Sequence, residues 1–86
     1  MRLVTEQEKR EMHILLDTCI DKMNSDKNRY KPHWNTLDLK ELQLMIVNEA
    51  SELDLALYQG NKQEIISEFK DIINLAIFGM HNLQVN

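Results

Sequence analysis

The chain has 86 residues, 43% of them hydrophobic and 28% charged, and its formal net charge is −4. This length supports one small domain, and the negative charge excludes the basic footprint of a nucleic-acid-binding protein. No apolar run approaches the roughly 20 residues needed to span a bilayer, and a single cysteine is typical of a reducing compartment. We therefore expect a soluble, cytoplasmic protein with no membrane partner and no nucleic-acid partner.

Two short patterns delimit the first half of the chain. The first helix is predicted over residues 5–23, because Thr5 and Glu8 have the spacing of a capping box and apolar residues follow at helical intervals. A polar segment that contains the only proline, residues 24–36, is predicted to be a loop. With only two glycines in the whole chain, the composition favours helices over a sheet with many turns.

The second half predicts a helical hairpin. One helix is expected over residues 37–59, and Gly60 is placed to end it in a left-handed backbone conformation. The next helix is expected over residues 62–83, with Asn61 as its cap. Gly79 leaves open a kink or break in the last turns of that helix.

The resulting fold class is all-α. We expect a single domain over residues 1–86, a short bundle of about three main helices completed by homo-oligomerisation. The third helix is apolar around much of its circumference, which suggests burial between neighbours, including those of a second subunit. A chain this short leaves much of its surface exposed, so association would remove further apolar area from water.

Four acidic residues form two pairs on the predicted hairpin. Glu49 and Glu52 are three residues apart on one helix, and Glu68 and Asp71 repeat that spacing on the next. Antiparallel packing would bring the pairs together, where their charges repel unless a divalent cation or shared protons neutralise them. Such pairs usually lie on solvated faces, but each of these borders or enters an apolar stripe. An all-oxygen ligand set suits Mg²⁺ or Mn²⁺.

A di-iron bundle is the obvious rival, but its E-x-x-H element is missing from these pairs. The compound pattern of E-x-x-E, a glycine-containing turn and E-x-x-D, with Asn74 three residues further on, resembles the MazG-like all-α NTP pyrophosphatases. The resemblance extends over roughly residues 34–80, in apolar register as well as in acids. Helix one matches only as an amphipathic helix in the expected place.

The resemblance implies a function and a set of roles. Members hydrolyse nucleoside triphosphates to monophosphate and pyrophosphate with Mg²⁺, and they usually act as dimers or tetramers. By position, Glu49, Glu52, Glu68 and Asp71 would be metal ligands. Glu49 and Glu52 would also be catalytic, with Glu52 orienting the attacking water. Asn74 would lie beside the metal-bound phosphates.

Further substrate contacts have two interpretations each. Lys62 and Lys70 would contact a triphosphate or face solvent. Trp34 would stack on a nucleobase whose edge His33 reads, or would plug the small core. The sequence does not choose between a canonical and a damaged nucleotide. The alternative to an enzyme is a non-catalytic helical oligomerisation or binding module with a vestigial or structural cation site.

Overall fold

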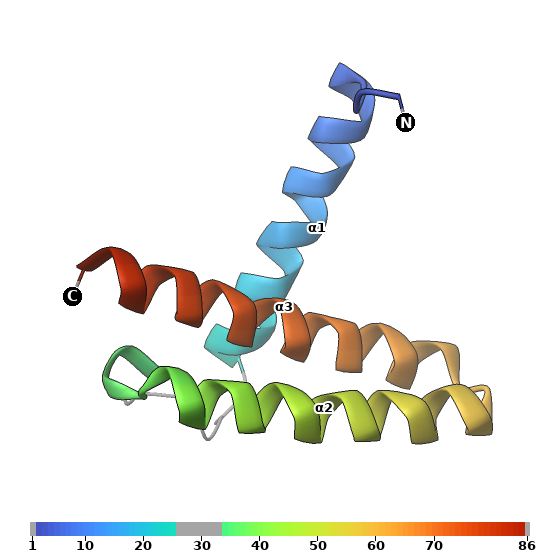
Figure 1. The fold of residues 1–86 in the computed structure, drawn as a ribbon. Helices are drawn as coiled ribbons and strands as arrows, with labels where there is room; N and C mark the ends of the chain where they lie inside the picture. The colour runs from blue at the N-terminus through green and yellow to red at the C-terminus, as the bar shows by residue number, and fades with distance from the viewer. Residues whose placement is uncertain (1, 26–33, 86) are drawn as a thin grey trace.

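The computed structural model describes residues 2–25 and 34–85, so residues 26–33 of the predicted loop lie outside the described part. The elements are α1 (Glu6–Ser25), the 3₁₀ turn η1 (Trp34–Thr36), α2 (Leu39–Gln59) and α3 (Lys62–Val85). The described residues form three α-helices and one 3₁₀ turn and no strand, which confirms the predicted all-α class. Figure 1 shows how the helices are arranged.

The first helix begins at the predicted capping box. The Glu8 amide donates to Thr5 Oγ1 at 3.1 Å, and the Thr5 amide donates to Glu8 Oε1 at 3.0 Å. These reciprocal bonds satisfy amides that have no partner inside the helix. The helix continues to Ser25, two residues beyond the predicted end at residue 23.

The ends of α2 and the start of α3 follow the local sequence. Asp38 caps α2 by accepting a hydrogen bond from the Glu41 amide at 2.8 Å. Gly60 ends α2 at φ 71° and ψ 20°, as predicted, a conformation that costs glycine little because it has no Cβ. Asn61 then accepts from the Glu64 amide at 3.1 Å and starts α3.

The core lies between α2 and α3, which run side by side as an antiparallel pair (Figure 1). Its buried residues are Leu42, Leu75 and Phe78, with Met23 of α1 and Trp34 of η1 packed against them. Thus α3 contacts α1, α2 and η1, as its apolar circumference predicted. It continues as one helix through Gly79, without the break that the sequence left open.

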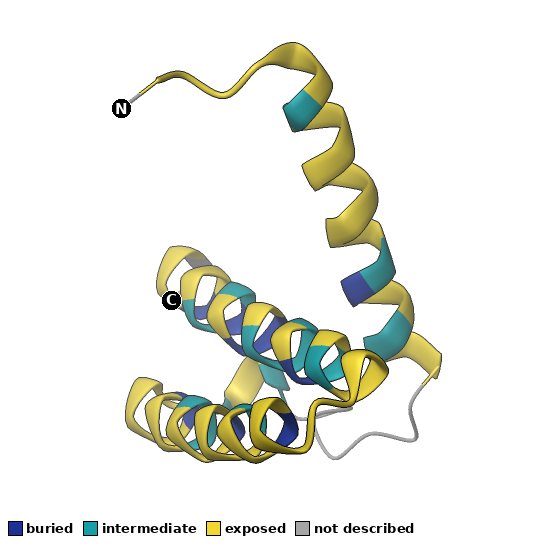
Figure 2. Ribbon diagram, turned by 90° about the vertical axis from the view of Figure 1, so that its right-hand side faces the viewer, coloured by how far each residue is buried: buried dark blue, intermediate teal, exposed yellow. Residues whose placement is uncertain are grey.

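The first helix is attached by one end only. It crosses α3 near its own C-terminal turns, and its N-terminal half extends away from the hairpin (Figures 1 and 2). Cys19 is its buried residue, whereas Met12, Leu15 and Leu16 are exposed. No helix in the described ranges is both long and apolar enough to cross a lipid bilayer.

Candidate metal and active site

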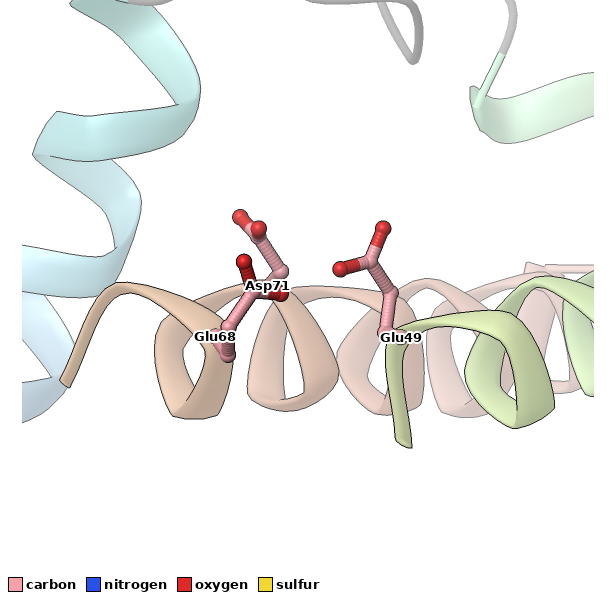
Figure 3. A group of neighbouring side chains, drawn as sticks. All are labelled: Glu49, Glu68 and Asp71. Atoms are coloured by element: carbon pink, nitrogen blue, oxygen red, sulfur yellow. The ribbon is translucent and has the colours of Figure 1, made fainter. Parts of the chain in front are cut away.

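Three of the four predicted acids meet across the hairpin. Glu49 of α2 and Glu68 and Asp71 of α3 each offer a carboxylate oxygen within 4.8 Å of the others. Figure 3 shows Glu68 and Asp71 next to each other and Glu49 reaching toward them from the facing helix. Glu49 is 1% exposed and Glu68 is 6% exposed, so the carboxylates have lost most of their hydration.

The electrostatics of the cluster centre on Glu68. The pKa of its carboxyl group is raised to about 8, chiefly by burial and in addition by hydrogen bonds with Glu49 and Glu64 and by the negative charges of Glu49 and Glu52. Oε2 of Glu68 is buried and accepts no hydrogen bond within the described structure. A carboxyl group in this setting holds a proton at neutral pH unless another cation compensates its charge.

The fourth acid takes a separate position. Glu52 is not within the 4.8 Å group, although its charge acts on Glu68. With Glu64 and Glu68 it lines a cavity of about 490 Å³ at the turn end of the hairpin. Sequence reasoning missed Glu64 as a neighbour of the cluster, because its position three residues after Asn61 pointed only to capping.

A lysine of α1 reaches the same cluster. Lys22 Nζ donates to Asp71 Oδ1 at 2.5 Å, to Ser67 Oγ at 2.8 Å and to the Ser67 carbonyl at 3.2 Å. Sequence reasoning missed this residue. A signal was available, because Lys22 follows Cys19 by three residues and so continues the buried side of α1.

The residues assigned to phosphate contacts mostly face α1. Asn74 is buried, and its Nδ2 donates to the Cys19 carbonyl at 2.9 Å, which fastens α1 to α3. Lys70 is half-buried, and its positive charge acts on the Cys19 thiol, whose pKa is raised chiefly by burial. Lys62 is exposed at the first position of α3. Their roles toward a substrate stay predictions.

The aromatic candidate packs on the core. The Trp34 ring stacks on Phe78 with ring centroids 4.8 Å apart and meets the edge of His81 at 4.9 Å. Asn82 Nδ2 donates to the carbonyls of Trp34, at 3.0 Å, and Leu37, at 3.2 Å. These contacts agree with the core-plug interpretation of Trp34 and hold η1 against α3. His33 lies outside the described residues.

An all-α hairpin with buried carboxylates facing one another agrees with the MazG-like class of pyrophosphohydrolases that the sequence pattern resembled. The chain belongs to the phosphoribosyl-ATP pyrophosphohydrolase family, which it matches over residues 10–86. This family is part of the MazG-like all-α NTP pyrophosphatase superfamily and implies a pyrophosphohydrolase. The predicted superfamily is thereby confirmed, although the match is to this branch and not to MazG itself. Searches of curated proteins and of solved structures gave no significant match.

Proposed function

We propose that the protein is a divalent-cation-dependent pyrophosphohydrolase that cleaves nucleoside triphosphates between the α- and β-phosphates. The observation that carries the proposal is the cluster of Glu49, Glu68 and Asp71, whose ligand oxygens lie within 4.8 Å of one another. Holding three acids at this distance, two of them buried, is costly unless a cation compensates their charge. Family membership indicates the reaction class, and the acidic cluster is the proposed site of the reaction.

The donor set fits Mg²⁺ or Mn²⁺. Hard divalent cations bind carboxylate oxygens and retain several waters, and the cluster offers carboxylates from two helices that fix their separation. The buried Oε2 of Glu68, which accepts no hydrogen bond within the described structure, is an oxygen whose desolvation a metal ion would offset. Glu49, Glu68 and Asp71 would hold the ion directly, and Glu52 is the fourth proposed ligand.

A bound divalent cation would neutralise phosphate charge and lower the pKa of a coordinated water. The chain's own residues then orient the reactants. Glu52, which lines the 490 Å³ cavity, is the proposed acceptor of a hydrogen bond from the attacking water. Glu49 is buried, with a carboxylate oxygen within 4.8 Å of those of Glu68 and Asp71. Asn74, Lys62 and Lys70 are proposed phosphate contacts.

The proposed substrate class is supported by the distance over which the site extends. Trp34 lies on Phe78, seven residues after Asp71 on α3, so the aromatic cluster and the acids are about 10 Å apart along the helix axis. An extended nucleotide is long enough to reach from the acids to Trp34, which packs on the core but is still partly exposed. The candidates are ribonucleoside and deoxyribonucleoside triphosphates and the family's namesake, phosphoribosyl-ATP, which carries the same triphosphate. His33 is the proposed reader of the base.

Homo-oligomerisation is part of the proposal. The exposed side of α1 carries Met12, Leu15 and Leu16, which with Ile73 of α3 line an apolar groove. Apolar surface of this kind on a small domain is removed from water by association. A homodimer or homotetramer would cover it, and sedimentation velocity would measure the state directly.

The test is pyrophosphate release from a panel of NTPs, dNTPs and phosphoribosyl-ATP with Mg²⁺ or Mn²⁺. We expect release from at least one nucleotide, with loss of activity in Glu49→Gln. Asp54→Asn is the matched control, because Asp54 is an exposed acid on the same helix. No release from folded protein, and no nucleotide-dependent rise in melting temperature, would favour the non-catalytic binding module instead.

A further inference from the structure

Each of the three N–H donors of the Lys22 ammonium group has an acceptor. A lysine ammonium has three N–H donors, and here they meet three acceptors, Asp71 Oδ1, Ser67 Oγ and the Ser67 carbonyl. The Lys22 side chain is 23% exposed and that of Asp71 is 17% exposed. The pair is therefore shielded from water, and its attraction is stronger than that of a surface ion pair.

The partner of Lys22 is one of the three clustered acids. Asp71 offers an oxygen within 4.8 Å of those of Glu49 and Glu68, and Lys22 is an ion-pair partner that α1 brings to it. The lysine thus supplies one positive charge to a group of acids that together carry more negative charge. A divalent cation on the same carboxylate would repel the ammonium at close range. Metal and lysine therefore compete for Asp71.

We propose that Lys22 is a phosphate-binding residue that rests on Asp71 before the metal binds and moves to the substrate triphosphate afterwards. This inference rests on the proposed function, because it needs both the metal and the nucleotide at the cluster. The four-carbon stem of lysine permits such a movement without displacement of the helix. The bond from Asn74 to the Cys19 carbonyl keeps α1 attached to α3 while the side chain turns. Lysine ammonium groups bind phosphate as point charges.

The first experiment measures Mn²⁺ binding by isothermal titration calorimetry without nucleotide. Lys22→Gln removes the competing cation, so we expect its Mn²⁺ dissociation constant to be roughly 3- to 10-fold lower than that of the unchanged protein. Lys22→Arg keeps the charge and should bind Mn²⁺ with nearly unchanged affinity. Lys9→Gln is the matched control, since Lys9 is an exposed lysine on α1 that pairs with Glu6.

The second experiment measures steady-state kinetics with the best nucleotide at saturating Mg²⁺. We expect Lys22→Gln to raise KM roughly 10-fold with a much smaller change in kcat, because a contact to the phosphates in the ground state is lost. Lys22→Arg should restore most of the KM. A merely structural lysine would lower the melting temperature and leave both the metal affinity and KM unchanged.

Ser67→Ala gives a second route that keeps the lysine and every acid. It removes one acceptor of the ammonium, so Mn²⁺ binding should tighten in the same direction as in Lys22→Gln, by a smaller factor. Unchanged or weaker Mn²⁺ binding in both variants, while the unchanged protein binds Mn²⁺ and hydrolyses nucleotide, would overturn the inference and leave the proposed function standing. Failure of the unchanged protein to bind Mn²⁺ would overturn both.

Discussion

Glu8 and Glu68 are glutamates of long helices, and their surroundings are opposite. Glu8 is only partly exposed, and the hydrogen bonds that its carboxylate accepts from the Arg2 guanidinium and the Thr5 amide lower the pKa of its carboxyl group to about 2. Glu68 is buried among other acids, which raises its pKa to about 8. The first carboxylate is stabilised by its sequence neighbours. The second is destabilised by burial and by acids that include Glu49 and Glu52, which only the fold brings near, and Glu64, one turn earlier on the same helix.

On the proposed function, this difference would separate a structural acid from a functional one. At Glu8 the negative charge satisfies the start of α1, and no further cation is needed. At Glu68 the ionised carboxyl group destabilises the folded state. A protein retains such a group when a site needs its charge for chemistry. Exchanging each glutamate for glutamine therefore tests the comparison directly.

The largest effect is expected on activity. Glu68→Gln should lower the rate of pyrophosphate release by roughly 100-fold or more, since it removes a charge that would hold the metal. Without metal and above about pH 8, where the Glu68 carboxyl group is ionised, the same variant should melt at a higher temperature than the unchanged protein, because the repulsion with Glu49 is relieved. Glu8→Gln should keep its activity and melt slightly lower. Equal activity in the two variants would contradict the assignment of the site.

The next effect compares a buried leucine of the core with an exposed leucine of α1. Leu75 is 0% exposed in the hairpin core, and Leu15 is 60% exposed on α1. Leu75→Ala should lower the free energy of unfolding by about 2–5 kcal/mol, measured by urea denaturation. Leu15→Ala should change it by less than about 0.5 kcal/mol in dilute protein. A cost for Leu15→Ala that grows with protein concentration would indicate that an oligomer buries this side of α1.

The pH dependence of the metal-free protein follows from Glu68. Its carboxyl group has a pKa of about 8 when folded, against 4.5 as the ordinary value, so the native state binds a proton that the unfolded state releases. Stability should therefore fall as the pH rises from about 5 to about 8. Thermal melting in EDTA checks this slope, which should be much weaker in Glu68→Gln.

Glu8 contributes nothing to that slope. Its pKa is lowered from 4.5 to about 2, so the stability that it supplies is fully present above about pH 5 and is lost only as the pH falls toward 2. A melting temperature of Glu68→Gln that still fell steeply between pH 5 and pH 8 would mean that another group carries the dependence.

The smallest effect is expected at the start of α1. Thr5→Ala removes the hydroxyl that accepts a hydrogen bond from the Glu8 amide. The free energy that stabilises α1 should fall by about 1 kcal/mol. Thr5→Ser keeps the hydroxyl and serves as the control. Hydrogen exchange of the amides in the first turn of α1 should be faster in the alanine variant alone.

The sequence by itself determined the helices and their capped ends, whereas α1 and α3 continue two residues beyond the predicted residues 23 and 83. The capping box of Thr5 and Glu8, the cap at Asn61 and the left-handed Gly60 depend on residues at most four positions apart, so local chemistry decides them. The spacing of the acids also placed Glu49 opposite Glu68, because a short turn forces the next helix to run back along the first.

Only the tertiary structure decided which groups share the site. It put Glu52 in the adjoining cavity, turned Asn74 toward Cys19 and brought Lys22 to Asp71 across 49 positions of sequence. The crossing of α1 over α3 depends on how their side chains interlock, and the separate pattern of each helix does not contain that information. A three-residue spacing fixes which side of a helix a carboxylate occupies, whereas its neighbours, its burial and its pKa depend on the packing of all three helices.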